Sequence, residues 1–302
     1  MTSGQFPDEQ GDDGEFERQE DAFREILTGR AEPGRYHLYV SLACPWAHRT
    51  LVVRKWVGLE DSVSVGIVDP VRDERGWAFR AGEGHGPDEL NGFHFLSEAY
   101  RASDPSFHGR VTVPVLWDKQ EKRIVNNSED DICRMFQTSF AGPDAPDLFP
   151  TELAEEQTAL SQFLYERVNN GVYRAGFATR QPAYERAVRK LFAALDELDS
   201  RLATRRYLFG DRITESDWRL FCTLVRFDAV YYGHFKCNLR RIIDYPSLNG
   251  YLRDLYQQPG IAETVNLDHI KRHYYITHDD INPTGIVPLG PILDFTVPHH
   301  RG

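Results

Sequence analysis

The sequence has few cysteines for its length. Only four occur among the 302 residues, and they lie far apart, at Cys44, Cys133, Cys222 and Cys237. There is no C-x-x-C pair and no cluster of cysteine and histidine at zinc spacing, which excludes a disulfide framework and argues against a metal centre. We therefore expect a reducing compartment, the cytoplasm, in which any of the four can serve as a free thiol.

Long hydrophobic runs and positive charge are also scarce. No apolar run approaches the ~18 residues that cross a bilayer, and the N-terminus is acidic rather than basic-then-apolar, so we expect neither a membrane partner nor a signal peptide. With 46 acidic against 35 basic residues, the net charge of −11 argues against nucleic acid as a partner. Part of this excess lies in residues 1–21, an acidic leader expected to be solvated and mostly disordered rather than an interaction tail.

The apolar content, 41% of the chain, is ample for a core, and the length favours two domains. The first half predicts a βαβ unit with a parallel strand pair, followed by a hairpin and a helix. A long segment over 69–110 has the weak periodicity typical of functional or mobile loops. The expected elements are a short helix over 23–27, strands over 36–40, 62–68, 111–118 and 123–125, and helices over 47–57 and from about 129 to 140.

The second half predicts helices almost throughout, after a linker rich in proline and aspartate. Thr214 and Asp217 have the spacing of a capping box, and no helical period is visible from His269 onward. The fold class is therefore α/β plus all-α. We expect helices over 153–174, 182–204, 214–232 and 246–257, and four segments: an acidic, partly disordered extension over 1–34, an α/β domain over 35–143, an all-helical domain over 144–268 and a C-terminal extension over 269–302.

Cys44 is the residue with the strongest chemical signal. It follows a predicted buried strand and precedes Pro45 in the first turn of a helix, where unpaired N–H groups and the helix dipole favour the thiolate and lower the thiol pKa. His48 and Arg49 would add positive potential; the alternative is a small buried cysteine without chemistry. Because position 47 is alanine, no second thiol lies three residues on, and a mixed disulfide at Cys44 needs an outside thiol for its resolution.

Two short segments admit both a binding and a structural interpretation. Val113-Pro114 predicts either a cis peptide bond, which would free the Val113 backbone to pair with a peptide-like ligand, or an edge or bulge in a strand. Ser128 and Glu129 stand at a predicted helix start. They either bind the charged end of a small ligand or cap the helix.

Several aromatic residues leave the same choice open. Trp77 lies in the long segment, as an aromatic lid or as a surface packing residue. Tyr173 and the pair Tyr274-Tyr275 are either core or interface aromatics or contacts to a ligand.

Five motifs together resemble the glutathionyl-hydroquinone reductases, the xi-class glutathione transferases, in order from about Tyr36 to Pro291. The resemblance implies a thioredoxin-like domain followed by a helical domain, in a cytoplasmic homodimer. It also implies no tightly bound cofactor, and glutathione or a related γ-glutamyl thiol as co-substrate with glutathionyl-hydroquinones. The motifs are Leu42-Ala43-Cys44-Pro45-Trp46-Ala47-His48-Arg49, Val113-Pro114-Val115-Leu116-Trp117-Asp118, Ile124-Val125-Asn126-Asn127-Ser128-Glu129, Asn169-Asn170-Gly171-Val172-Tyr173 and Ile281-Asn282-Pro283-Thr284-Gly285-Ile286-Val287-Pro288.

The resemblance further implies that the Cys44 thiolate attacks the thioether sulfur, releases hydroquinone and is then freed from its glutathione disulfide by a second glutathione. A conjugating transferase, the main alternative, would use a serine or tyrosine hydroxyl, and a non-catalytic interaction module need not keep a thiol at the helix start. By resemblance, glutathione is held by Trp77, Arg110, Val113, Ser128 and Glu129; the catalytic tyrosines that face the ring are Tyr173 and Tyr274, with His273 and Tyr275 also in the substrate site.

Overall fold

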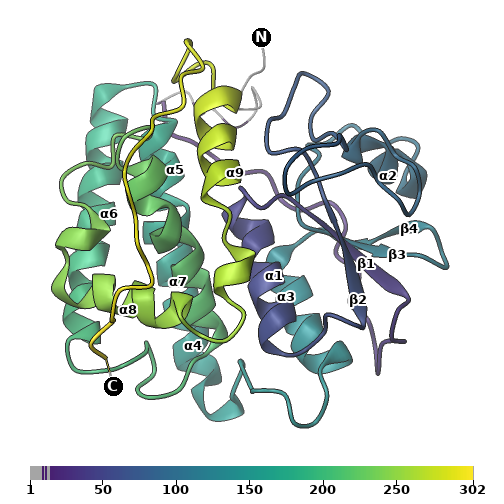
Figure 1. Cartoon of the computed structure of the whole chain (residues 1–302), viewed down its shortest axis with the longest axis horizontal. Helices are drawn as coiled ribbons and strands as arrows, with labels where there is room; N and C mark the ends of the chain where they lie inside the picture. The colour runs from purple at the N-terminus through teal and green to yellow at the C-terminus, as the bar shows by residue number, and fades with distance from the viewer. Residues whose placement is uncertain (1–8, 10, 12–13, 302) are drawn as a thin grey trace. The chain divides into compact units, whose positions relative to one another are not determined.

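The computed structural model describes residues 9, 11 and 14–301, and these fall into two compact units (Figure 1). The first unit contains residues 19–146 and 264–286, and the second contains the described residues before 19, residues 147–263 and residues 287–301. The extension expected over 269–302 is thus divided between the units. The disorder expected for residues 1–8, 10, 12 and 13 lies outside the described residues.

The first unit is built on a four-stranded sheet in the order β2-β1-β3-β4. Strand β1 pairs in parallel with β2 and antiparallel with β3, and β3 pairs antiparallel with β4, so the predicted βαβ unit and hairpin are confirmed. Helices α1 and α3 lie on one side of the sheet and α2 on the other, as in a thioredoxin-like domain (Figure 1). The elements are β1 (Tyr36–Val40), α1 (Pro45–Trp56), β2 (Val63–Ile67), α2 (Leu96–Ser103), β3 (Val115–Asp118), β4 (Arg123–Asn126), α3 (Glu129–Met135) continued by a π-helical turn (Phe136–Phe140), and α9 (Leu267–Arg272) continued by another (His273–Thr277).

The core of this unit lies between the sheet and its helices. Every residue of β1 is buried, because helices cover both of its faces, and this explains its continuous apolar and aromatic sequence. Leu38, Val52, Leu116 and Ile132 are fully buried and come from β1, α1, β3 and α3. The sheet and α1 therefore place the residue before α1, Cys44, on a rigid support.

The second unit is helical, as predicted. Helix α7 begins at the predicted capping box, in which the Thr214 N–H and hydroxyl donate to Asp217 Oδ2 at 2.8 and 3.0 Å, and all 12 residues of α7 are buried. The α-helices described in this unit are α4 (Ala154–Leu164) with a π-helical turn (Tyr165–Asn169), α5 (Gly171–Gly176), α6 (Gln181–Leu202), α7 (Glu215–Arg226) with a π-helical turn (Phe227–Tyr231), and α8 (Pro246–Tyr256). Among the described residues, no helix combines the length and apolar character that a membrane span requires.

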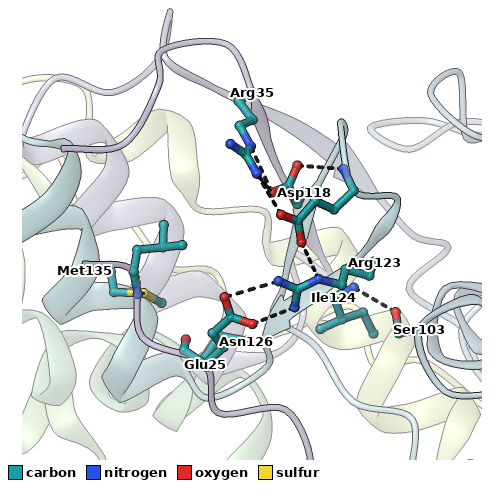
Figure 2. Close-up of polar contacts among 10 residues, drawn as sticks. Glu25, Arg35, Ser103, Asp118, Arg123, Ile124, Asn126 and Met135 are labelled. Atoms are coloured by element: carbon teal, nitrogen blue, oxygen red, sulfur yellow. Dashed lines mark hydrogen bonds and ion pairs between the residues drawn. The ribbon is translucent and has the colours of Figure 1, made fainter. Parts of the chain in front are cut away.

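The helix predicted over 23–27 is wrong. This segment is extended beside β4: the Glu25 N–H donates to the Val125 carbonyl at 3.2 Å, and Arg24 forms an isolated bridge with Asn126. Figure 2 shows the side-chain contacts that hold it there, including the two hydrogen bonds of Arg123 to the Glu25 carboxylate at 2.6 and 3.2 Å. Long-range pairing has overridden a short apolar pattern that resembles a helix.

Two helices were not predicted. Helix α2 lies inside the long segment over 69–110, and α9 with its π-helical turn covers 267–277, where the sequence shows no helical period from His269 onward. Asn266 caps α9, since its side chain accepts a hydrogen bond from the His269 N–H at 2.9 Å. The absence of helical structure expected from His269 onward is therefore wrong for residues 269–277.

Candidate active site

Cys44 is the N-cap residue of α1, directly after the turn that follows β1. Pro45 occupies the first helical position, and the Cys44 N–H donates to the Ser41 carbonyl at 3.2 Å. Its thiol is half-buried, and Sγ lies 3.7 Å from the carbonyl oxygen of Val113. Cys44 and Val113, far apart in the sequence, are therefore neighbours in the first unit.

The other three cysteines are in a different environment. All four are free thiols, but Cys133, Cys222 and Cys237 are at most 2% exposed, whereas Cys44 is partly open to solvent. Burial raises the pKa of the Cys237 thiol far above its usual range, so that this group stays protonated. Exposure distinguishes Cys44 as the reactive candidate.

The peptide bond between Val113 and Pro114 is cis, and Val113 is 5% exposed just before β3. Arg110 lies three residues earlier, between α2 and β3, and is half-buried. Residues 110–113 therefore connect the candidate binding residue Arg110 to Val113, whose carbonyl lies beside the Cys44 thiol.

Ser128 and Glu129 stand where α3 begins. Ser128 is the N-cap residue, but its side chain makes no capping hydrogen bond, so the ordinary capping interpretation is not what the structure shows. Glu129 Oε1 lies 3.1 Å from Arg49 Nη2, and the same guanidinium pairs with Asp130. Because α1 carries Arg49, this ion-pair group joins the helix of Cys44 to the start of α3.

The expected positive potential from the neighbours of Cys44 needs correction. The buried Arg49 guanidinium is balanced by the carboxylates of Glu129 and Asp130. His48 is fully buried, and its Nε2 lies 2.8 Å from the hydroxyl of Thr264. Cys44 also stands at the N-terminus of α1, whose N–H groups and dipole favour an anionic sulfur.

Trp77 is 5% exposed, and the ring of His273 stacks on it with centroids 5.0 Å apart and planes 21° apart. The Arg72 guanidinium carbon lies 5.3 Å from the centroid of the Trp77 ring. The structure therefore brings together two predicted site residues, Trp77 and His273, that come from the two separate sequence segments of the first unit.

The segment after α9 carries the other predicted aromatic residues of this unit. Tyr274 is 1% exposed, with its ring centroid 5.3 Å from those of His273 and His278. Tyr275 is half-buried, and burial raises the pKa of its phenol. The Tyr275 phenol is therefore protonated at neutral pH.

Tyr173 belongs to the second unit, on α5, and is 8% exposed. Sequence reasoning missed two of its neighbours in the acidic leader. Phe16 stacks on the Tyr173 ring at 6.3 Å between centroids, and the Arg18 guanidinium carbon lies 5.1 Å from its centroid. Arg18 Nε also donates to Asn170 Oδ1 at 3.2 Å. The only available signal was an aromatic and a basic residue inside an otherwise acidic stretch.

Within the part of the chain that the structure describes, no group of three or more histidine, cysteine or acidic side chains could hold a metal ion.

Two family models match the chain: the N-terminal domain of glutathione S-transferase over residues 43–139 and its C-terminal domain over residues 181–254. The first match falls in the unit that contains Cys44, and the second falls in the helical unit. The fold and these matches define a glutathione transferase with a cysteine at the start of its first helix.

The relatives of this chain indicate which class of glutathione transferase it is. The chain is 51% identical to glutathionyl-hydroquinone reductase YqjG of Escherichia coli, with 95% of this chain and 92% of the relative covered. It is also 51% identical to glutathionyl-hydroquinone reductase PcpF of Sphingobium chlorophenolicum, with 92% and 90% covered. The glutathione-bound structure of YqjG has a TM-score of 0.89 at 51% identity, covering 92% of this chain and 96% of that chain. The xi glutathione S-transferase of Phanerochaete chrysosporium has a TM-score of 0.92 at 46% identity, with 96% of both chains covered. The chain belongs to the glutathionyl-hydroquinone reductases, the enzymes of the xi class of glutathione transferases.

Proposed function

We propose that this enzyme reduces glutathionyl-hydroquinones through a covalent intermediate on Cys44. The observation that carries the assignment is the position of this thiol: among the four cysteines, Cys44 is the one that is partly exposed, and it stands at a helix N-terminus. A thiolate stabilised there is a nucleophile for sulfur. Glutathione, or a related γ-glutamyl thiol, is the co-substrate.

The first half-reaction breaks the bond between sulfur and the aromatic ring. The Cys44 thiolate attacks the thioether sulfur, a disulfide forms between Cys44 and glutathione, and the electron pair of the broken C–S bond goes to the ring carbon. That carbon takes a proton, which we assign to the phenols of Tyr274 and of Tyr173 from the second unit. His273 and Tyr275 belong to the same segment as Tyr274, and we assign this segment to the substrate site.

The second half-reaction restores the thiolate. A second glutathione thiolate attacks the glutathione sulfur of the mixed disulfide, giving oxidised glutathione and free Cys44. Since position 47 is alanine, the chain has no thiol of its own in the C-x-x-C position to replace it.

Glutathione binding is assigned to residues of the first unit. Val113 would pair with the peptide backbone of the tripeptide beside Cys44, and the Ser128 hydroxyl and Glu129 carboxylate would bind the charged γ-glutamyl end. Trp77 and Arg110 complete the set, with the Arg110 cation suited to a carboxylate of the ligand.

The assembly and compartment follow from the family resemblance. We propose a homodimer in the cytoplasm, a reducing compartment that suits an enzyme whose four thiols are all free. Light scattering on the purified chain measures the assembly, and a monomeric mass at micromolar concentration would contradict it.

Intact-protein mass spectrometry tests the mechanism. With a glutathionyl-hydroquinone and no free thiol, each subunit should gain one glutathionyl group, release one hydroquinone and stop. Cys44→Ser should gain none, whereas Cys222→Ser, which changes a buried thiol, should react as the parent does. Repeated turnover without thiol, or full activity in Cys44→Ser, would overturn the mechanism.

Two further tests separate the alternatives. Ala47→Cys creates a C-x-x-C pair and should release glutathione once per subunit without added thiol. A conjugating transferase would instead join glutathione to an electrophilic arene and form no adduct on Cys44. A non-catalytic module would form neither product.

A further inference from the structure

Helix α9 and its π-helical continuation hold the loop that carries Trp77. Three side chains spaced four residues apart, and hence on one face of the helix, bond to backbone atoms of this loop. His269 Nε2 lies 2.7 Å from the Glu83 carbonyl, and His273 Nδ1 lies 2.7 Å from the Pro70 carbonyl. The Thr277 hydroxyl accepts the Arg72 N–H at 3.2 Å. We call residues 70–83 the Trp77 loop.

His273 is the residue that makes two kinds of contact with this loop. It is 7% exposed, its ring stacks on Trp77, and its Nδ1 bonds to the Pro70 carbonyl. A carbonyl oxygen only accepts hydrogen bonds, so Nδ1 carries a proton. One imidazole therefore fixes both the backbone where the loop begins and the plane of the tryptophan within it.

The loop also has contacts of its own. Isolated bridges join Asp73 to Gly76, Ala78 to Phe95 and Gly82 to His85, and Arg80 pairs with Asp73. No helix or strand of the described residues covers the Trp77 loop, so the buried contacts from α9 act with these bridges to fix its conformation. A buried carbonyl that loses its hydrogen-bond donor destabilises this conformation of the loop and favours others.

We propose that His273 is a positioning residue for glutathione, which acts by fixing the Trp77 loop and the ring plane of Trp77. This inference rests on the proposed function, in which Trp77 binds the tripeptide. It is separate from the assignment of the His273 segment to the substrate site, which for His273 would mean a direct contact with the hydroquinone. Because glutathione enters both half-reactions, a fault in the Trp77 loop weakens both, whereas a lost contact to the hydroquinone weakens only the first.

The test uses His273→Phe, which keeps an aromatic ring against Trp77 and removes the Nδ1–H donor. We expect the dissociation constant of glutathione for the enzyme to rise about tenfold, the equivalent of one buried hydrogen bond. Resolution of a preformed Cys44–glutathione disulfide should also slow, because its glutathionyl group occupies the same site. The control is His108→Phe, an exposed histidine of the same unit, which should change neither value.

A second measurement does not depend on catalysis. Amide hydrogen exchange in the Trp77 loop should accelerate in His273→Phe while exchange in β1 stays slow, which also shows that the variant is folded. His273→Asn, whose side-chain N–H can replace Nδ1–H at the Pro70 carbonyl, should restore slow exchange near Pro70.

Three results would overturn the inference: unchanged exchange in the Trp77 loop of His273→Phe, slower hydroquinone release with an unchanged rate of resolution, or losses in glutathione affinity that add fully to those of Trp77→Ala. Full additivity would mean that the two residues act independently. If the parent enzyme formed no adduct on Cys44, the proposed function would fail. The exchange measurement would still decide whether His273 holds the loop.

Discussion

Replacing Arg49 by methionine should lower the free energy of unfolding of the first unit by about 3 kcal/mol. The Arg49 side chain is 2% exposed, and its guanidinium lies 3.1 Å from Glu129, whose side chain is 14% exposed. Removing one partner of a buried ion pair typically costs about 3–5 kcal/mol, because the other charge stays buried. We expect the lower end, since the second carboxylate, on Asp130, is 52% exposed and regains water.

A double-mutant cycle isolates the pair. Glu129→Gln alone should cost less than Arg49→Met, because Arg49 keeps Asp130, and the double variant should lose less than the sum of the two, with a coupling of about 1–3 kcal/mol. Urea unfolding followed by tryptophan fluorescence suits the measurement, since four of the five tryptophans lie in the first unit. Arg101→Met, an exposed change on α2, is the control and should cost less than about 0.5 kcal/mol.

Two outcomes would refute this reasoning. If Arg49→Met were as stable as the parent, the ion pair would contribute no net stability, and α1 and α3 would be joined by apolar packing alone. If the two single losses simply added, Arg49 and Glu129 would not interact in solution.

Three further results are expected. Iodoacetamide should modify Cys44 at least about 10³-fold faster than the three buried cysteines, which react only after local opening; comparable rates, measured by peptide mass spectrometry, would contradict the assignment. Burial lowers the pKa of His37 to about 4, so its imidazole resists protonation in the folded state. The stability that the neutral imidazole contributes is present above pH 6.5 and is lost as the pH falls toward 4. At pH 5 this loss is about 2 kcal/mol, and unfolding of His37→Phe should show a correspondingly shallower pH dependence, whereas parallel pH profiles would refute it. Phe16→Ala should destabilise the second unit by about 2–3 kcal/mol and, through Tyr173, slow hydroquinone release. Alkylation of Cys44 should not change. An unchanged release rate would mean that Phe16 does not support the substrate site.

Local sequence patterns predict the parts of the fold whose contacts are local. The strand–helix–strand order around Cys44 and the capping box of Thr214 and Asp217 are recorded in neighbouring residues, and the structure confirms both. The segment over 23–27 shows the limit, because its backbone bonds to Val125 and Asn127 come from a strand about 100 positions away. Nothing near Phe23 in the sequence indicates that pairing.

The candidate site shows the same division. The eight-residue motif that contains Cys44 and Pro45 predicts that Cys44 stands at a helix start, and the structure confirms this. The stacking of His273 on Trp77 and the position of Arg18 over Tyr173 each join segments that are distant in the sequence. Composition and periodicity contain no information on such pairs, and only the family resemblance grouped some of these residues together.

The contacts of α9 have a consequence for biosynthesis. The first unit is discontinuous: the ribosome makes its sheet early, then the helices of the second unit, and only afterwards His273 and Thr277. Until His273 and Thr277 have been made, their bonds to the Pro70 carbonyl and the Arg72 N–H do not form, although the strand before Cys44 can already pair. The Cys44 thiol is thus made before the contacts that order the Trp77 loop, which form only after the helices of the second unit have been synthesised.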